Sequence, residues 1–313
     1  MKIVITQRVF PDTIDLLSPH ADVMVGPPSQ GADALMVFMP DSLDEAFLRE
    51  CPTLKIVAGA LKGCDNFDVE ACTLLGIWFT IVPDLLTEPT AELALALLLG
   101  LARYVLPGDR LIRSGAFQGW RPILYGTGLA GSTVGIIGFG AVGRALARML
   151  QGFSCRIQYC DPSADGSTPL GVLLASSDFV LPLLPLTPET FHLLGREALA
   201  GMKRGAFLIN VSRGSVVDEE AAADALVSGR LGGYAADTFE MEDWALRDRP
   251  REIYPRLLRL TDRTLFTPHL GSAVASARLQ IELAAAGSIL QALRGEHPSG
   301  AINNPVPRHN RQH

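Results

Sequence analysis

Three glycines, Gly138, Gly140 and Gly143, stand directly after the apolar run TVGIIG and at the start of the helical segment AVGRALARML. At such a strand–helix junction the first glycine allows a tight turn, the second lets the backbone approach a pyrophosphate, and the third lets the helix pack on the strand. The helix N-terminus then offers its free amide groups to the anion. The motif therefore predicts a dinucleotide-binding α/β unit.

An aspartate, Asp161, ends the next predicted strand, CRIQYCD, roughly 20 residues after the motif, where dinucleotide-binding units place an acidic residue. A carboxylate at this position accepts hydrogen bonds from the adenosine ribose of NAD and repels the 2'-phosphate of NADP. The sequence therefore predicts NAD as the cofactor, in preference to NADP.

The rest of the chain also alternates strand-like runs with helical stretches, which is typical of parallel α/β sheets. The runs are KIVIT, ALMVFM, LKIVAGA and IWFTIV before a long apolar helix that begins near Thr87, and RIQYCD, DFVLPLLPL, AFLINVS, GYAADTF and TLFTPHLG after the glycines. We predict an α/β protein with two Rossmann-like, doubly wound parallel-sheet domains. A NAD-binding domain (87–274) is expected to be inserted in a flavodoxin-like substrate domain (1–86 and 275–313).

The composition is that of a globular protein that binds a small molecule. The 313 residues are 48% hydrophobic and carry a formal charge of -6 without a basic stripe, so neither a nucleic acid nor a membrane is a predicted partner. The longest apolar run, LALALLLGLA, is shorter than a membrane span. The five cysteines lack metal-ligand spacing, so no metal site is predicted and the thiols are expected to be free. With no signal-peptide pattern at the start, this predicts a cytoplasmic location.

An arginine, a carboxylate and a histidine follow successive strands of the second domain: Arg213 in NVSRGSVVDE, Glu242 in ADTFEMEDW and His269 in FTPHLGSA. The carboxyl ends of parallel strands line the ligand crevice, so these side chains can converge on one substrate. A histidine takes or gives a proton near neutral pH, and a carboxylate beside it orients the ring. Each residue alone also fits an ordinary surface or core role.

The chain resembles the D-2-hydroxyacid dehydrogenase family, in which Arg, Glu and His follow a glycine motif in this order. The segments ALKGCDNFDVEACT, RSGAFQGWRPILYGTGL, RGSVVDE, GYAADTFEMEDW and LFTPHLGSAVASARLQIE carry the resemblance, and they are similar to the phosphite dehydrogenase branch of that family. The resemblance implies catalytic roles for Arg213, Glu242 and His269. It implies cofactor contacts from the glycine motif and the strand ends, namely from Gly138, Gly140, Ala141, Val142, Gly143, Asp161, Thr90, Leu184, Pro185, Val211, Ser212 and Asp237.

A lysine, Lys62, stands in the small-residue loop ALKGCDN, where hydroxyacid dehydrogenases usually carry small or hydroxyl residues. Phosphite is a compact oxyanion, and Lys62, Arg213 and Arg278 are expected to surround it with positive charge. The resemblance implies that Gly63, Met39, Trp120, Tyr125 and Ser272 complete the substrate pocket. Alternatively, Trp120 and Tyr125 are interface aromatics and Met39 is a core residue.

The predicted reaction is the oxidation of phosphite to phosphate, in which hydride passes from phosphorus to NAD and water attacks phosphorus. One alternative is a reductase of glyoxylate or hydroxypyruvate. Another is a non-enzymatic corepressor, which would share the fold and bind the same cofactor.

Two further expectations concern assembly and length. The apolar helix near Leu93 to Leu101 and the arm RSGAFQGW predict a homodimer. The segments 25–33 and 162–172 are each shorter, by about one helix, than in the phosphite dehydrogenases that the chain resembles. Both are expected to lie in outer layers of their sheets.

Overall fold

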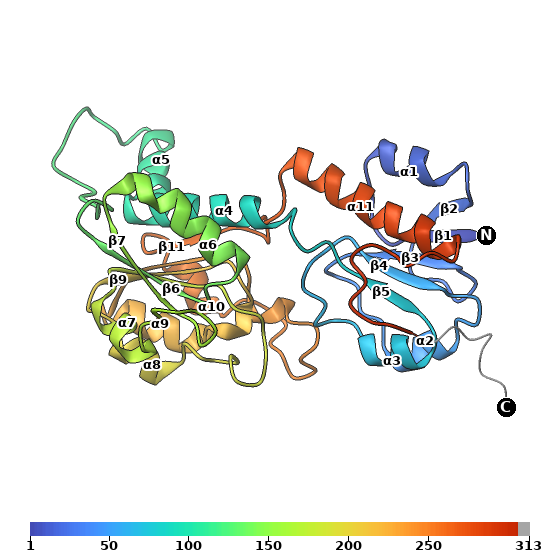
Figure 1. Cartoon of the computed structure of the whole chain (residues 1–313). Helices are drawn as coiled ribbons and strands as arrows, with labels where there is room; N and C mark the ends of the chain where they lie inside the picture. Colours follow the sequence, from blue (N-terminus) through green and yellow to red (C-terminus); the bar gives the residue numbers. More distant parts are fainter. Residues whose placement is uncertain (306–313) are drawn as a thin grey trace. The chain divides into compact units, whose positions relative to one another are not determined.

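The computed structural model describes residues 1–305 and divides into two compact units (Figure 1). Unit 1 consists of Met1–Leu86, Trp244–Arg247 and the chain from Ser272 onward, and unit 2 consists of Thr87–Asp243 and Asp248–Gly271. The tail NNPVPRHNRQH is polar and interrupted by proline, which predicts a mobile segment, and most of it, residues 306–313, lies outside the described residues. Both units are parallel α/β sheets, so the predicted fold class is confirmed.

Unit 1 is a five-stranded parallel sheet in the order β2-β1-β3-β4-β5, the flavodoxin-like order. Its elements are β1 (Lys2–Ile5), α1 (Pro11–Leu17), β2 (Asp22–Val25), β3 (Ala34–Val37), α2 (Glu45–Arg49), β4 (Ile56–Gly59), α3 (Val69–Leu74), β5 (Trp78–Thr80) and α11 (Ala275–Leu293). Helices α1 and α11 cover one face, and α2 and α3 cover the other (Figure 1).

Local sequence explains where the short helices of this unit begin. Asp44 accepts a hydrogen bond from Phe47 N at the start of α2, and Asp68 accepts one from Ala71 N at the start of α3. Aspartate is a favoured N-cap because its carboxylate satisfies an amide that has no partner within the helix. Residues of the central strands alternate between the two faces; Val4, for example, packs toward α2 and α3, whereas Ile3 and Ile5 pack toward α1 and α11.

The first shortened segment leaves one edge of this sheet thinly covered. Residues 26–33 connect β2 to β3 without a helix, although parallel strands are usually joined through one. Met24 and Val25 of the edge strand β2 are 42% and 49% exposed as a result. The expected loss of an outer-layer helix therefore shows as exposed apolar side chains, and the buried core of the unit lies under β1, β3 and β4.

Unit 2 is a six-stranded parallel sheet in the order β11-β10-β9-β8-β6-β7. Its elements are α4 (Thr87–Ala102), α5 (Val105–Arg113), β6 (Thr133–Ile137), α6 (Ala141–Leu150), the 3-10 turn η1 (Gln151–Phe153), β7 (Arg156–Cys160), α7 (Leu170–Ser176), β8 (Phe179–Pro182), α8 (Arg196–Gly201), β9 (Ala206–Asn210), η2 (Gly214–Val216), α9 (Glu219–Val227), β10 (Leu231–Ala236), η3 (Glu240–Glu242), α10 (Pro255–Arg259) and β11 (Thr264–Phe266). Helices α4 and α6 cover one face, and α7, α8 and α9 cover the other (Figure 1).

The second shortened segment leaves β7 at the edge of the sheet. A Rossmann sheet in the order 3-2-1-4-5-6 has one more strand outside the second. Here residues 161–169 run as a loop directly into the seven-residue helix α7, and β8 returns on the other side of β6. Pro182, unexpected in a strand, is the last residue of β8, where a missing amide interrupts no further strand pairing.

Helix α4 explains the longest apolar run of the sequence. Its residues Ala94, Leu97, Leu98 and Leu101 are buried against the sheet of unit 2. Within residues 1–305, no single helix is long and apolar enough to cross a membrane; α4 and α5 reach that length and hydropathy only as a pair bent by 62°.

A buried carboxylate joins the last helix of unit 1 to the first. Glu282 of α11 is 3% exposed and accepts hydrogen bonds from Phe10 N at 2.9 Å and from Thr13 Oγ1 at 3.3 Å, at the start of α1. The side chain of Glu282 therefore holds the start of α1 against α11, although the two helices lie far apart in the sequence.

We expect Glu282→Leu to lower the free energy of unfolding of unit 1 by about 1–3 kcal/mol for each donor left without a partner. Glu282→Gln keeps an acceptor oxygen and should lose less. Urea denaturation followed by circular dichroism measures both. A Glu282→Leu variant as stable as the parent protein would show that these hydrogen bonds contribute nothing.

Candidate active site and cofactor-binding residues

The glycine motif forms the turn between β6 and α6. Gly138 has φ +92°, and a Cβ there would lie 2.5 Å from the carbonyl oxygen of Leu183. A Cβ on Gly143 would lie 2.4 Å from Gly138 O, whereas a Cβ on Gly140 would meet no atom within 4 Å. Gly138 and Gly143 are thus required by the close packing of the turn, and the space above Gly140 is open to a ligand.

Asp161 lies beside this turn at the end of β7. Its carboxylate accepts hydrogen bonds from Ser163 N at 2.8 Å and from Phe139 N at 2.7 Å, and these bonds lower the pKa of Asp161 below its ordinary value. Carboxylate oxygens accept more than one hydrogen bond each, so the side chain can still receive ribose hydroxyls. The loop that follows β7 therefore leaves Asp161 ionised and fixed against the glycine turn.

The other predicted cofactor residues lie at one edge of the same sheet. Leu184 and Pro185 follow β8, Val211 and Ser212 follow β9, Asp237 follows β10, Ala141 and Val142 begin α6, and Thr90 lies in the first turn of α4. The strands are parallel, so these loops meet at the carboxyl edge, where dinucleotides bind. An open glycine turn, a helix N-terminus and an ionised aspartate together fit NAD.

Asp237 organises the loop that carries the predicted catalytic histidine. It is 1% exposed, and its Oδ1 accepts hydrogen bonds from Thr267 Oγ1 at 2.6 Å and Leu270 N at 2.7 Å. Its Oδ2 accepts from Gly271 N at 2.9 Å. Burial raises the pKa of Asp237, and the hydrogen bonds oppose that rise. The resemblance implies that this residue contacts the cofactor; within unit 2, its side chain binds the loop.

Glu242 and His269 are in direct contact. His269 Nδ1 lies 2.8 Å from Glu242 Oε2, while Glu242 Oε1 accepts a hydrogen bond from Phe239 N at 2.9 Å. His269 has φ +55°, which is unusual for a residue with a side chain, and its backbone amide donates to Asp237 O at 2.9 Å. The ring is thus held through its Nδ1, which leaves Nε2 for proton transfer. The predicted histidine–carboxylate pair is assembled within unit 2.

Arg213 lies between β9 and the turn η2. Its Nη1 donates to Ser212 O at 2.9 Å, and its carbonyl oxygen accepts from Asn210 Nδ2 at 2.8 Å. The next residue, Gly214, is so close to the neighbouring turn η3 that a Cβ would lie 1.8 Å from the carbonyl carbon of Phe239. Arg213 and Glu242 are therefore carried by two 3-10 turns in contact with each other.

Four further residues at these turns were not among the predicted site residues: His192, Glu219, Glu240 and Asp243. His192 Nε2 lies 3.0 Å from Glu240 Oε2, and Asp243 Oδ2 accepts a hydrogen bond from Ser215 N at 2.6 Å. In the sequence, Glu219 and Glu240 look like ordinary acidic residues at the start of a helix and in a charged loop. In the fold, Glu219 is 3% exposed, and Glu240 is distinguished by its contacts with Glu219 and His192.

In unit 1, the predicted anion-binding residues lie on neighbouring loops. Lys62 follows β4, and Met39 follows β3. Arg278, in the first turn of α11, donates to Ala60 O at 3.2 Å, and its guanidinium carbon lies 5.6 Å from the centre of the Phe38 ring. Burial lowers the pKa of Arg278 below its ordinary value, although Glu282 at 3.8 Å opposes the shift. Arg278 therefore contacts the same loop that carries Lys62.

The remaining predicted pocket residues differ in their surroundings. Gly63 follows Lys62 in the loop after β4, and Ser272 precedes α11, where its carbonyl accepts from Val274 N at 2.9 Å. Trp120 and Tyr125 are 79% and 77% exposed on the segment that follows α5. Within unit 2 the two aromatics are therefore surface residues.

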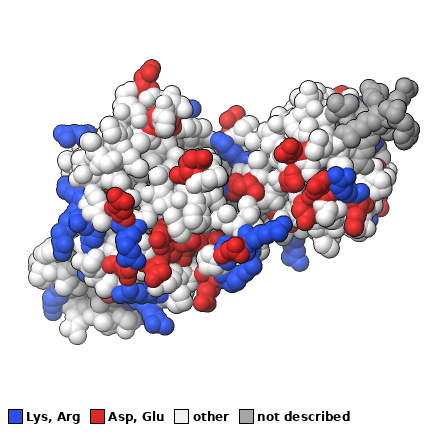
Figure 2. Space-filling view, turned by 90° about the horizontal axis from the view of Figure 1, so that it is seen from below, with Lys and Arg blue, Asp and Glu red and all other residues white. Residues whose placement is uncertain are grey.

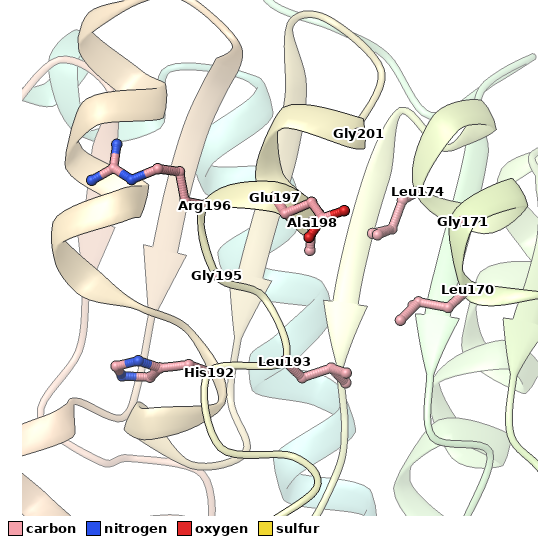
Figure 3. Close-up of a pocket in the computed structure, with 10 residues that line it drawn as sticks. All are labelled: Leu170, Gly171, Leu174, His192, Leu193, Gly195, Arg196, Glu197, Ala198 and Gly201. Carbon is pink, nitrogen blue, oxygen red and sulfur yellow. The ribbon is translucent and has the colours of Figure 1, made fainter.

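The hollow in Figure 3 does not coincide with the predicted site. It has a volume of about 480 Å³ and lies between α7 and α8, where Leu170, Leu174 and Leu193 line it. The ring of His192 points away from these leucines (Figure 3). Within the described part of the chain, no group of three or more His, Cys, Asp or Glu side chains could hold a metal ion.

Figure 2 shows basic and acidic side chains intermixed on the face in view. Such a surface lacks the continuous basic stripe that binds a nucleic-acid backbone.

Three comparisons relate the chain to known proteins. Residues 95–271 match the sequence model of the D-isomer specific 2-hydroxyacid dehydrogenase NAD binding domain. A glyoxylate reductase from Pyrococcus horikoshii is 39% identical over 288 positions, which cover 88% of this chain and 84% of that protein. One from Thermococcus onnurineus is 34% identical over 331 positions, which cover 97% of this chain and 96% of that protein. A crystal structure of a protein from Thermus thermophilus superposes with a TM-score of 0.89 at 33% identity, covering 96% of this chain and all of that one.

The second alignment also bears on chain length. It spans 331 positions, more than the 313 residues of this chain, so gaps fall in this chain. This agrees with the short connections after β2 and β7. The match to an NAD-binding domain confirms the predicted cofactor.

The three glycines lead to a prediction that separates packing from binding. We expect Gly143→Ala to lower the melting temperature, because the added methyl group would overlap Gly138 O. Gly140→Ala has room for its methyl group within the protein, so it should keep its stability and lose affinity for NADH, whose pyrophosphate would approach there. Thermal denaturation and NADH fluorescence titration measure the two effects. Equal NADH affinity in Gly140→Ala and the parent protein would contradict the assignment.

Proposed function

Since the chain belongs to the D-isomer specific 2-hydroxyacid dehydrogenase family, we propose that this NAD-dependent oxidoreductase reduces small 2-oxo acids of the glyoxylate and hydroxypyruvate class. The observation that carries the proposal is the contact of His269 with Glu242, 2.8 Å apart, on a unit of the family's NAD-binding type. The named relatives are glyoxylate reductases, so this reaction replaces phosphite oxidation as the first reading. An assembled proton-transfer pair also supports an enzyme over a corepressor.

Proton transfer and substrate binding are assigned to different residues of the site. Bound NADH supplies the hydride that reduces the carbonyl carbon of glyoxylate. His269 gives its Nε2 proton to the carbonyl oxygen, and Glu242, in contact with Nδ1, stabilises the charged ring beforehand. Arg213 binds the carboxylate of the substrate through its planar guanidinium. The product is a 2-hydroxy acid, and the same groups run the reverse reaction.

A specific observation favours phosphite oxidation as the second candidate. Lys62 and Arg278 provide two cations at one loop of unit 1, because Arg278 donates to Ala60 O, two residues before Lys62. A doubly charged oxyanion gains more from two such cations than a monocarboxylate does. In that reaction phosphite and water give phosphate, hydride reduces NAD⁺, and His269 accepts the proton of the attacking water.

A cytoplasmic location fits this proposal. Cys72, Cys155 and Cys160 are free thiols, as is usual in a reducing compartment.

One assay, which follows both the oxidation of NADH and the reduction of NAD⁺, distinguishes the two candidate substrates. We expect purified protein to oxidise NADH with glyoxylate or hydroxypyruvate and to form little NADH from NAD⁺ and phosphite, since the family relation supports the former. Absorbance at the NADH band measures both. Turnover of phosphite, with none of the oxo acids, would overturn the first proposal and establish the second. His269→Ala should abolish whichever activity is present while retaining NADH binding.

Substitution of Lys62 tests which of the two anions is the substrate. Lys62→Met should raise KM for phosphite at least about tenfold if phosphite is the substrate, because it removes a charge-assisted contact. It should affect glyoxylate less. Lys55→Met removes an exposed lysine of the same unit and should leave both reactions unchanged.

Coenzyme choice is proposed to depend on Asp161. Its ionised carboxylate faces the glycine turn, where it would repel the 2'-phosphate of NADP. We expect the protein to prefer NADH, and the double variant Asp161→Ala with Pro162→Arg to shift the ratio of kcat/KM values toward NADPH by more than about tenfold. Steady-state kinetics with each coenzyme give the ratio. A smaller shift would show that another group discriminates.

A homodimer is proposed from the segment that contains α5. None of the residues of α5 is buried within unit 2, and Val105 and Ile112 are 60% and 55% exposed, close in sequence to Trp120 and Tyr125. Such an apolar surface is typical of an interface. We expect a dimer in sedimentation-velocity experiments and a monomer in the variant Ile112→Asp with Trp120→Asp. A monomeric parent protein at micromolar concentration would contradict this prediction.

A further inference from the structure

A second histidine contacts both turns that carry the predicted catalytic residues. The side chain of His192 reaches η3, where its Nε2 lies 3.0 Å from Glu240 Oε2. Its backbone amide reaches η2, where it donates to Ser215 O at 2.7 Å. Glu240 precedes Glu242 by two residues, and Ser215 follows Arg213 by two. One residue thus bridges the two turns.

A buried carboxylate continues this contact. Glu219, 3% exposed, accepts a hydrogen bond from Glu240 N at 2.9 Å, and Glu219 N in turn donates to Glu240 Oε1 at 2.9 Å. The other oxygen of Glu219 accepts from Tyr254 N at 2.7 Å. Glu240 is therefore fixed by its backbone, by one carboxylate oxygen at Glu219, and by the other at His192.

The charges around His192 favour its protonated form. The hydrogen bond to Glu240 raises the pKa of His192 above its ordinary value; burial opposes the rise, and Asp218 and Glu219 add to it. Burial, with Glu240 and Asp243 nearby, raises the pKa of Glu219. A protonated His192 offsets the negative charge of the carboxylates near η3, among them Glu219 and Glu240.

The two turns are packed too closely to move independently. A Cβ on Gly214 would lie 2.2 Å from Glu240 N, and Ser215 N donates to Asp243 Oδ2 at 2.6 Å. His192 itself has φ +48°, a strained conformation that persists only where surrounding contacts enforce it. Displacement of Glu240 would therefore shift η3 and, with it, the carboxylate that orients His269.

We propose that His192 is a positioning residue for the Glu242–His269 pair: through Glu240 and Ser215 it fixes η3 against η2 and thereby sets the orientation of the catalytic histidine. Its ring contacts Glu240 and the stacked ring of Phe191, 4.1 Å away between centroids, and it acts on the reaction only through the turns. The kinetic test of this inference rests on the proposed function, whereas its spectroscopic test requires no substrate.

The experiment compares His192→Ala, which removes the contact with Glu240, with His192→Gln, whose amide nitrogen can occupy the position of Nε2. We expect His192→Ala to lower kcat for glyoxylate about tenfold to a hundredfold, as a small misplacement of a catalytic group does, with KM and NADH affinity nearly unchanged. His192→Gln should recover most of the loss at neutral pH. Arg196 lies four residues after His192 and forms an ion pair with Asp224. Arg196→Gln, which breaks that ion pair, is the matched control and should keep full activity.

A measurement without substrate separates this inference from the proposed function. The NMR signals of the His269 ring, assigned with His269→Gln, should change position in His192→Ala and return toward the parent positions in His192→Gln. If the parent protein turns over no oxo acid, the proposed function fails, and this NMR comparison still tests the inference. Unchanged His269 ring signals in His192→Ala, or an unchanged kcat, would overturn it; so would an equal loss of kcat in Arg196→Gln.

Discussion

All six strands of unit 2 run parallel, so every strand ends at the same edge of the sheet and every loop that leaves this edge begins beside its neighbours. The loops there have little secondary structure, and their buried amides need acceptors other than a strand or a helix. Carboxylates supply them. Asp161, Asp237, Glu219, Glu242 and Asp243 each accept at least one backbone N–H from a loop at this edge. The acidic side chains thus hold these loops in place, and in our proposal Glu242 also takes part in the chemistry.

This use of carboxylates explains why two histidine–carboxylate contacts lie so close together. A partly buried carboxylate is stabilised by an opposite charge, and a histidine can supply one while adding only one ring. Glu242 uses one oxygen for Phe239 N and the other for His269, and Glu240 uses one for Glu219 N and the other for His192. In our proposals, the same local arrangement serves proton transfer at one histidine and positioning at the other.

The family relation and the cations of unit 1 favour different substrates. A shared fold and a proton-transfer pair fit many 2-hydroxy acids, whereas Lys62 and Arg278 add charge that a monocarboxylate does not require. The guanidinium of Arg278 lies 5.6 Å from the centre of the Phe38 ring and is partly desolvated, which would strengthen its attraction to an anion. The charge of the substrate anion, in addition to the reaction chemistry, therefore distinguishes the two candidate substrates.

The sequence by itself determined the parallel α/β architecture, because the alternation of strand-like and helical runs and the G-x-G-x-x-G turn obey local rules of backbone geometry. It also indicated His269 and Glu242, since each follows a predicted strand. It could not reveal His192, Glu219 or Glu240, whose letters are those of an ordinary polar surface. Their contacts join residues 21 to 48 positions apart, and only Glu219 among them is fully buried, at 3% exposed. Only the tertiary structure decided which of the many acidic residues became buried, because desolvation is a property of the packed chain and not of the residue.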